Sequence, residues 1–109
     1  MNIHDFHVQG AMIDHHTRCA HYHSSTDIVA IKFRCCQTYY PCYQCHEEET
    51  NHSIRVWKKE EFDQKAILCG NCANELTINE YLGRDFCIYC QSAFNPNCQR
   101  HYHLYFEMT

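Results

Sequence analysis

Residues 69–90 read CGNCANELTINEYLGRDFCIYC, and this stretch decides how the chain folds. Cys69 and Cys72 form one C-x2-C pair, and after fourteen intervening residues Cys87 and Cys90 form a second. Each pair places two sulfurs on one side of a tight turn, at the separation that a tetrahedral ion needs. Two such knuckles joined by a loop of this length predict a closed four-cysteine zinc site. A pair of redox dithiols is the alternative, but the βαβ context of such dithiols is absent here.

Eight further cysteines and histidines stand at metal-ligand spacing upstream of this stretch. They are Cys19, His21, Cys35, Cys36, Cys42, Cys45, His46 and His52. Tetrahedral zinc takes four nitrogen or sulfur ligands, so the twelve residues together would fill three closed sites. We therefore expect three Zn²⁺ ions that act as structural elements.

The upstream ligands are expected to divide into two sites. Cys42 and Cys45 form a third knuckle that needs two more ligands. Cys19 and His21 are candidates, because residues i and i+2 of an extended segment face the same way. A further site would then be made of the remaining residues, which are Cys35, Cys36, His46 and His52.

Adjacent ligands support this division and also leave it open. Cys45 and His46 are neighbours, so their side chains diverge towards two different metals. The same argument could place Cys35 and Cys36 on different ions. The ligand set is therefore predicted more firmly than its partition between the first two sites.

The composition requires some staple other than an apolar core. Leu, Ile, Val and Phe make up only 21 of the 109 residues, whereas ten residues are cysteines. Small domains with so little core depend on disulfides or metals. The chain also carries ten histidines, which disulfide frameworks do not use, and the vicinal pair Cys35 and Cys36 bridges poorly to itself. Zinc is the favoured staple, and a disulfide scaffold is the alternative.

The charge balance argues against nucleic acid as a partner. The formal net charge is −4, and nine thiolates with three Zn²⁺ ions would bring it to about −7. Nucleic-acid binding depends on Lys and Arg that neutralise phosphates, and here these residues are scattered. The first seventeen residues lack the apolar region of a secretory signal, and no apolar run is long enough to span a membrane. We expect neither nucleic acid nor membrane as a partner, and the oligomeric state stays open.

Alternating apolar residues predict short strands in three places. In the segment Thr26 to Arg34, Val29, Ile31 and Phe33 alternate on one face. In the segment Ser53 to Lys58, Ile54 and Val56 point inward and Trp57 lies on the opposite face. In the segment His101 to Glu107, Tyr102, Leu104 and Phe106 alternate and predict a closing strand.

One short helix is predicted between the second and third of these segments. Thr77 and Glu80 form a capping-box pattern, and Gly83 is placed to end the helix. Glu47, Glu48 and Glu49 are interpreted as a solvated loop tip. The fold class is therefore a small metal-stabilised α+β zinc-finger domain with short strands, zinc knuckles and one short helix.

The domain organisation is expected to be simple. Residues 1–13 are predicted to form an N-terminal arm, and residues 14–109 one zinc-binding domain. The alternative is that the domain divides into two lobes, 14–60 and 61–109. Cys98, His101 and His103 either bind a fourth, labile metal together with an N-terminal histidine or play ordinary packing and hydrogen-bonding roles. We favour the second interpretation.

No catalytic motif is evident in the sequence. Pro41-Cys42-x2-Cys45 matches half of the zinc-deaminase signature, but the first glutamate of the chain is Glu47, after the motif. The chain has only three glycines and no phosphate-cradling loop. Closed sites also leave no open coordination position for a substrate. We therefore expect a protein that is not an enzyme.

The ordered ligand series resembles the CHY-type zinc finger. The resemblance rests on Cys19-Ala20-His21-Tyr22, followed by Cys35-Cys36, Tyr40-x-Cys42-x2-Cys45-His46, His52 and the two knuckles of residues 69–90. Phe94-Asn95-Pro96 with Cys98, His101 and Tyr102 is similar to the stand-alone branch of that family. This branch includes a small helper protein of the mitochondrial intermembrane space that acts on twin-cysteine import chaperones. The resemblance implies three structural zincs bound by the twelve residues named above.

Three functional hypotheses follow. The first is a non-enzymatic zinc protein that handles zinc or cysteine-rich client proteins, as the resemblance implies. The second is a protein-interaction module with structural zinc, suggested by eight Tyr, six Phe and one Trp. The third, which ranks last, is a thiol redox protein. We expect a cytoplasmic location, with the mitochondrial intermembrane space as the alternative if the chain is eukaryotic.

Overall fold

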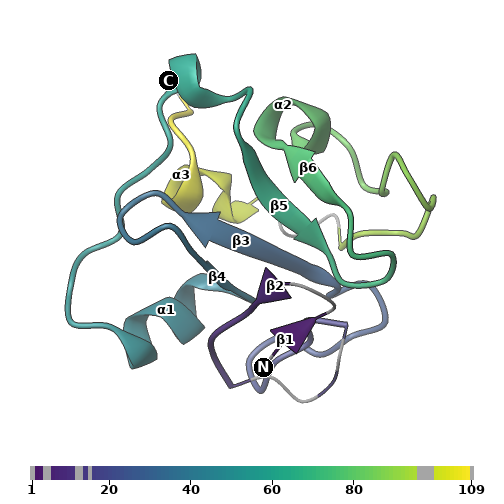
Figure 1. Ribbon diagram of the computed structural model, residues 1–109, viewed down its shortest axis with the longest axis horizontal. Coiled ribbons are helices and arrows are strands. Elements are labelled where there is room, and N and C mark those ends of the chain that lie inside the picture. The colour runs from purple at the N-terminus through teal and green to yellow at the C-terminus, as the bar shows by residue number, and fades with distance from the viewer. Residues whose placement is uncertain (1, 4–5, 12–13, 15, 96–99, 109) are drawn as a thin grey trace.

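A four-stranded antiparallel sheet forms the centre of the computed structural model, which describes residues 2–3, 6–11, 14, 16–95 and 100–108 (Figure 1). The strand order is β4 (Thr38–Tyr40), β3 (Val29–Phe33), β5 (Lys65–Cys69) and β6 (Glu75–Thr77). A separate two-stranded hairpin pairs β1 (Asn2–Ile3) with β2 (Phe6–His7). Among the described residues, no helix has both the length and the apolar character that crossing a membrane requires.

Strand β3 follows the predicted alternation. Val29, Ile31 and Phe33 are buried in the main core, which confirms this part of the sequence prediction. Their neighbour Ala30 is also fully buried, because the other face of the sheet is covered as well. In β5 a register irregularity between Lys65 and Ile67 interrupts the simple alternation.

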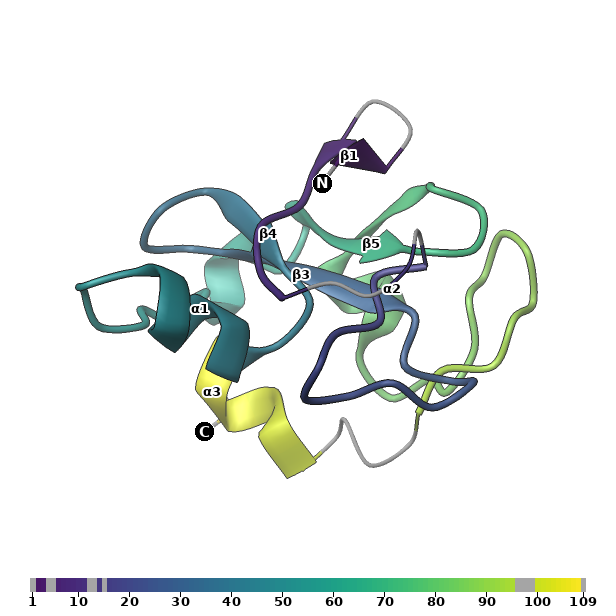
Figure 2. The same cartoon turned by 90° about the horizontal axis from the view of Figure 1, so that it is seen from below.

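The second face of the sheet is covered by the N-terminal segment. Val8, Ala30, Tyr39 and Leu68 form a small separate cluster, with Phe6 half-buried against it. Figure 2 shows the β1–β2 hairpin on one side of the sheet and α3 (Tyr102–Tyr105) on the other. The central strands are therefore covered on both faces, even though the chain is short.

Helix α2 (Ile78–Tyr81) is the helix that the capping box predicts. The Glu80 backbone N–H donates to Oγ1 of Thr77 over 3.1 Å, and the Thr77 N–H donates to Oε1 of Glu80 over 2.8 Å. Gly83 follows the C-cap residue Leu82 with φ +78°, a conformation that favours glycine. The predicted start and end of this helix are both confirmed.

The predicted closing strand at residues 101–107 is wrong, because the segment contains helix α3. The buried residues are Tyr102, Tyr105 and Phe106, which have helical i, i+3, i+4 spacing, whereas Leu104 is only half-buried. The rings of Tyr102 and Phe106 pack edge to face at 5.9 Å. The segment is therefore helical because its aromatic rings pack together, although three of its apolar residues alternate as they would in a strand.

The predicted strand at residues 53–58 is also wrong. Only an isolated bridge from Trp57 to Phe106 forms there, and Trp57 is the buried residue while Ile54 and Val56 are half-buried. The Trp57 indole N–H donates to the Lys32 carbonyl over 2.7 Å, which satisfies its polar group inside the core. The large indole therefore determines which side of this segment faces inward.

Helix α1 (Tyr43–Glu49) was not predicted. Its N-cap is Cys42, whose sulfur accepts from the backbone N–H of Cys45 over 3.4 Å. Glu47, Glu48 and Glu49 are exposed as expected, but they form the last turn of this helix rather than a loop tip. A 3-10 helix, η1 (Lys59–Glu61), completes the regular elements.

Gly70 tests how tightly the first knuckle of the 69–90 stretch packs. A Cβ atom at this position would overlap the His16 backbone carbonyl and lie 2.9 Å from the Ile28 carbonyl oxygen. We predict that Gly70→Ala lowers the free energy of unfolding of the zinc-loaded protein by about 3 kcal/mol. The control Gly83→Ala meets no atom within 4 Å and costs only about 1 kcal/mol through its positive φ. Guanidinium unfolding measures both, and equal losses would contradict the packing argument.

Candidate metal centres

The structure brings all twelve predicted ligands into three groups of four. They are Cys19, His21, Cys42 and Cys45 (the first site), Cys35, Cys36, His46 and His52 (the second site), and Cys69, Cys72, Cys87 and Cys90 (the third site). Within each group the ligand atoms all lie within 4.8 Å of one another. This grouping coincides with the partition that the sequence favours. That the twelve residues bind metal stays a prediction.

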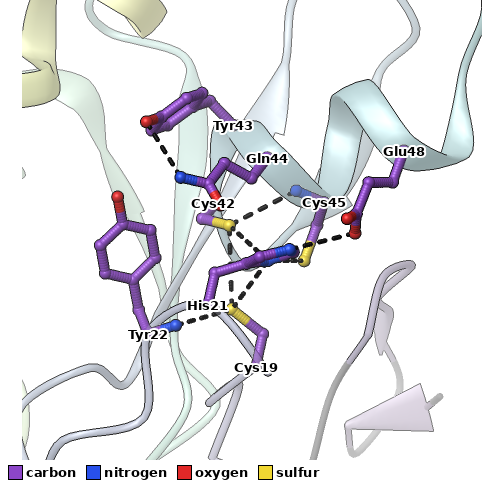
Figure 3. Close-up of polar contacts among 8 residues, drawn as sticks. All are labelled: Cys19, His21, Tyr22, Cys42, Tyr43, Gln44, Cys45 and Glu48. Carbon is purple, nitrogen blue, oxygen red and sulfur yellow. Dashed lines mark hydrogen bonds and ion pairs between the residues drawn. The ribbon is translucent and has the colours of Figure 1, made fainter.

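The first site joins a loop to the start of a helix. Cys42 and Cys45 lie at the N-cap and in the first turn of α1, and the loop contributes Cys19 and His21 (Figure 3). The sulfurs of Cys19 and Cys42 are 3.8 Å apart. Nδ1 of His21 lies 3.5 Å from the sulfur of Cys42 and 3.5 Å from that of Cys45. Four donor atoms therefore face one point.

Glu48 orients the His21 imidazole at this site. Nε2 of His21 lies 3.1 Å from Oε1 of Glu48, on the side of the ring away from the sulfurs (Figure 3). A carboxylate next to Nε2 keeps the imidazole proton on that nitrogen. Nδ1 is then unprotonated, and its lone pair is available to bind a metal. Burial opposes a charged imidazole, but contacts with Cys19 and then Glu48 raise the pKa of His21.

The thiols of the first site share hydrogen bonds. Hydrogen bonding with Cys42 and then with Cys45 lowers the pKa of Cys19 to about 2, and the same contact with Cys19 raises the pKa of Cys42. The Tyr22 backbone N–H also donates to the Cys19 sulfur over 3.4 Å. The site therefore favours a thiolate on Cys19, which is the charge state that a zinc ligand requires.

Residues 8–11, which we call the N-terminal strap, close the first site. The Gln9 N–H donates to the Tyr39 carbonyl over 2.9 Å, and Val8 is fully buried. Gly10 has φ +125°, and a Cβ there would lie 3.0 Å from the sulfur of Cys45. The hydrogen bond with Cys19 raises the pKa of Cys45 to about 11, and a bond from the Ala11 backbone N–H opposes this shift. The strap therefore lies directly against a ligand.

The second site is built around one buried histidine. Nε2 of His46 lies 3.2 Å from the Cys35 sulfur and 3.1 Å from Nε2 of His52. The His46 ring stacks on Phe33 with centroids 4.4 Å apart and planes 17° from parallel. Cys35 and Cys36 lie in the turn after β3, separated from its end by one residue, and their sulfurs are 3.9 Å apart. Burial, then the charge of Cys35, raise the pKa of Cys36.

The third site uses the two predicted knuckles. The sulfurs of Cys69 and Cys90 are 3.8 Å apart, as are those of Cys72 and Cys87. Burial is the largest influence on Cys90 and raises its pKa, but hydrogen bonds from Asn71 and from Ser92 outweigh it and bring the value to about 6. Hydrogen bonds from uncharged groups therefore favour a thiolate on Cys90, at the more exposed end of this site.

The backbone repeats itself in both knuckles of the third site. The Ala73 N–H donates to the Cys69 carbonyl over 2.8 Å, and the Gln91 N–H donates to the Cys87 carbonyl over 2.9 Å. Ala73 has φ +61° and Gln91 φ +67°, a left-handed conformation that non-glycine residues adopt at some cost. The same strained turn therefore positions both sulfur pairs.

Most donor separations fit zinc, although the 3.2 Å from the Cys35 sulfur to Nε2 of His46 is shorter than the edge that the ion requires. A tetrahedral ion with Zn–S bonds of about 2.3 Å and Zn–N bonds of about 2.0 Å requires edges of about 3.8 Å between sulfurs and about 3.5 Å from sulfur to nitrogen. The first and third sites have sulfur–sulfur distances of 3.8 Å, and the first site has sulfur–nitrogen distances of 3.5 Å. In the second site, the shorter 3.1 Å distance between two imidazole nitrogens is close to the edge of about 3.3 Å that two Zn–N bonds require.

Several functional features escaped the sequence analysis. The strap over Cys45 has no sequence signal other than a glycine. The contact of Glu48 with His21 has none other than the helical i, i+3 spacing of Cys45 and Glu48. The hypothesis of a fourth site involves Cys98, which lies outside the described residues. His101 is half-buried between the rings of Tyr22 and Tyr43, and His103 is exposed.

Comparisons with known proteins define the class. The family model described as CHY zinc finger matches residues 19–81, which is more than half of the chain. The chain therefore belongs to the CHY zinc finger family and is a cysteine-rich zinc-binding module. This result confirms the resemblance drawn from the ligand series.

Relatives match over nearly the whole chain. Helper of Tim protein 13 of Saccharomyces cerevisiae is 38% identical, over 92% of this chain and 90% of that protein. The protein of the same name in Kluyveromyces lactis is 35% identical, over 91% and 87% respectively. An uncharacterized protein of Schizosaccharomyces pombe is 43% identical, over 92% and 88%. The similarity therefore extends well beyond the residues that the family model matches.

The three donor sets predict the metal content. They contain three, two and four cysteines respectively, so we expect three zinc ions per chain by elemental analysis. Complete removal by a strong chelator should abolish the native circular dichroism, since binding and folding are coupled in such small domains. A chain that keeps its native spectrum without metal would contradict this prediction.

The strap should slow the release of metal from the first site. Val8→Ser places a hydroxyl in an apolar cluster and weakens the attachment of the strap, so release from this site should become about tenfold faster. Cobalt substitution measures this, because thiolate-to-cobalt absorbance follows the number of sulfur ligands. The accelerated phase should carry about three ninths of the absorbance, given three of the nine thiolates. Equal acceleration at all three sites would mean that the substitution destabilises the whole domain.

Proposed function

We propose that this protein is a non-enzymatic zinc-binding protein that handles zinc for cysteine-rich client proteins. The observation that carries the proposal is the similarity, over nine tenths of the chain, to two proteins named Helper of Tim protein 13. The reactive groups of cysteine-rich clients are their thiols, and thiolates bind zinc readily. The three Cys/His groups supply the matching chemistry.

The donor sets support a role without catalysis. Each group already offers four donors, which fill the tetrahedral shell of zinc and leave no position for an activated water. The twelve residues then serve to bind metal and to hold the fold. On this proposal zinc is a structural element and a cargo rather than a reaction centre.

We also propose the mitochondrial intermembrane space as the compartment. The expectation of a cytoplasmic protein finds no support in the comparisons. The alternative is favoured by the relatives named as helpers of Tim, together with the stand-alone CHY resemblance. A compartment in which thiols of partner proteins are oxidised would give a zinc-handling protein a purpose, because zinc-bound thiolates are poor substrates for oxidation.

Zinc transfer from a client tests the proposal. The full chain, partly depleted of zinc by a limited amount of chelator, is mixed with a reduced, zinc-loaded twin-cysteine import chaperone. After separation, elemental analysis should find at least half of the chaperone's zinc on this chain, and the chaperone should then oxidise faster. A chaperone that keeps its zinc and its oxidation rate after this treatment would contradict zinc handling.

A second candidate function is a protein-interaction module with purely structural zinc. Most aromatic rings, including those of Tyr39 and Tyr40, are buried, so they pack inside the domain. Phe86 and Tyr89, on either side of Cys87, are 38% and 49% exposed. In the experiment above, stable binding of the chaperone without movement of zinc would favour this second function. A thiol redox role ranks last, since zinc-bound thiolates exchange poorly.

A further inference from the structure

The three sites differ in how their ligands are buried. Of the four donors of the first site, three are cysteines that are at most 4% exposed. The third site keeps two fully buried cysteines, Cys69 and Cys87, and two half-buried ones. In the second site only His46 is fully buried, Cys35 and Cys36 are half-buried, and His52 is exposed. His52 is the one exposed residue among the twelve ligands.

The segment that carries His52 is held loosely. Between the end of α1 at Glu49 and Trp57, the chain forms no helix or strand. Within the described part of the chain, no backbone hydrogen bond anchors residues 51–56. The firm attachments lie at the two ends, where the Thr50 N–H donates to the His46 carbonyl over 3.1 Å and the Trp57 N–H donates to the Tyr105 carbonyl over 2.9 Å. Such segments open locally at low cost in free energy.

The other three donors of the second site are anchored independently of His52. The stack on Phe33 and the edge contact with Tyr40 at 5.2 Å fix the His46 ring. The Thr50 hydroxyl lies 3.5 Å from Nδ1 of His46, the ring nitrogen that does not face the site. Cys35 and Cys36 stand in the turn between two paired strands, β3 and β4. If His52 leaves, three donors therefore stay in position and one coordination position opens.

The first site has no comparable weak point. The N-terminal strap covers the sulfur of Cys45, and Glu48 holds the imidazole of His21 from its far side. Its histidine is two residues from Cys19, in a segment where the Cys19 N–H donates to the Tyr22 carbonyl over 2.9 Å. The two histidine-containing sites thus differ in kind, one covered by the chain and the other open at a single ligand.

We propose that the second site is the one at which zinc enters and leaves, and that His52 is the ligand displaced by an incoming thiolate. This inference rests on the proposed zinc-handling function and names the place where it occurs. When zinc leaves, the bond from zinc to the His52 nitrogen breaks and a bond to a client sulfur forms, while the client thiol releases its proton to solvent. Uptake from a zinc-loaded client is the reverse step, in which the His52 nitrogen displaces a client sulfur and that sulfur takes up a proton. No oxidation or reduction takes place. The client is a protein with accessible, reduced cysteines.

The order of metal release tests this directly. The full chain carrying three cobalt ions is mixed with excess 4-(2-pyridylazo)resorcinol, and the loss of thiolate-to-cobalt absorbance is followed in time. The fast phase should carry about two ninths of the absorbance, because the second site has two of the nine thiolates. Release from the first or third site would instead remove about three or four ninths. Either of those values, or a single phase in which all three ions leave together, would overturn the inference.

Substitution of the leaving ligand gives a second, independent measurement. In the zinc-loaded protein, His52→Cys should slow the fast release at least tenfold, because a thiolate is a stronger zinc ligand than an imidazole. The matched control His21→Cys makes the same change in the first site and should leave the fast phase unaltered. A fast phase that is insensitive to His52→Cys would refute the role of His52. If His52→Cys fails to fold, the cobalt measurement on the unsubstituted chain still decides.

The chaperone and chelator experiments together separate metal lability at the second site from zinc handling. A chain that takes zinc from the import chaperone but loses cobalt first from another site would keep the function and refute the second site as its place. A chain that releases the second-site metal first to the small chelator, yet takes no zinc from the chaperone, would keep the inference on lability and refute zinc handling.

Discussion

The seven-residue helix α1 links two metal sites, and much of the structure depends on that link. Cys42 and Cys45 at its start belong to the first site, and the next residue, His46, belongs to the second. A helix of this length is marginal in water on its own, because its nucleation costs more than its few hydrogen bonds return. The two metal sites hold the helix in place through these three ligands. The helix in turn fixes the relative positions of the three ligands.

The central sheet positions ligands of the second and third sites. Strand β3 ends at Phe33, two residues before Cys35, and its neighbour β5 ends at Cys69. Because these strands are antiparallel, their ligand-bearing ends lie at opposite ends of the sheet. The second and third sites are therefore kept apart by a ladder of backbone hydrogen bonds, and neither can take ligands from the other.

Metal-ligand spacing proved more predictive than apolar periodicity. The knuckles and the capping box are local signals, and the structure has the twelve ligands grouped and α2 capped as those signals indicate. The errors arose where distant contacts decide. Residues 102–105 are helical because the rings of Tyr102 and Phe106 pack on Tyr81 and on one another, and Trp57 turns inward to reach the Lys32 carbonyl. The strap over Cys45 depends on a segment more than thirty residues upstream, which no local pattern reveals.

On our proposal, unequal burial of the sites lets one of them exchange metal while the domain stays folded. The first turn of α1 is held by Cys42 and Cys45 in a site that the strap covers. The β3–β4 hairpin is held by its own ladder and by the buried side chain of Phe33. We therefore expect both supports of the second site to persist when its metal leaves. In a domain held together by a single shared metal cluster, loss of one metal would affect the whole fold. Separate sites with separate supports avoid this.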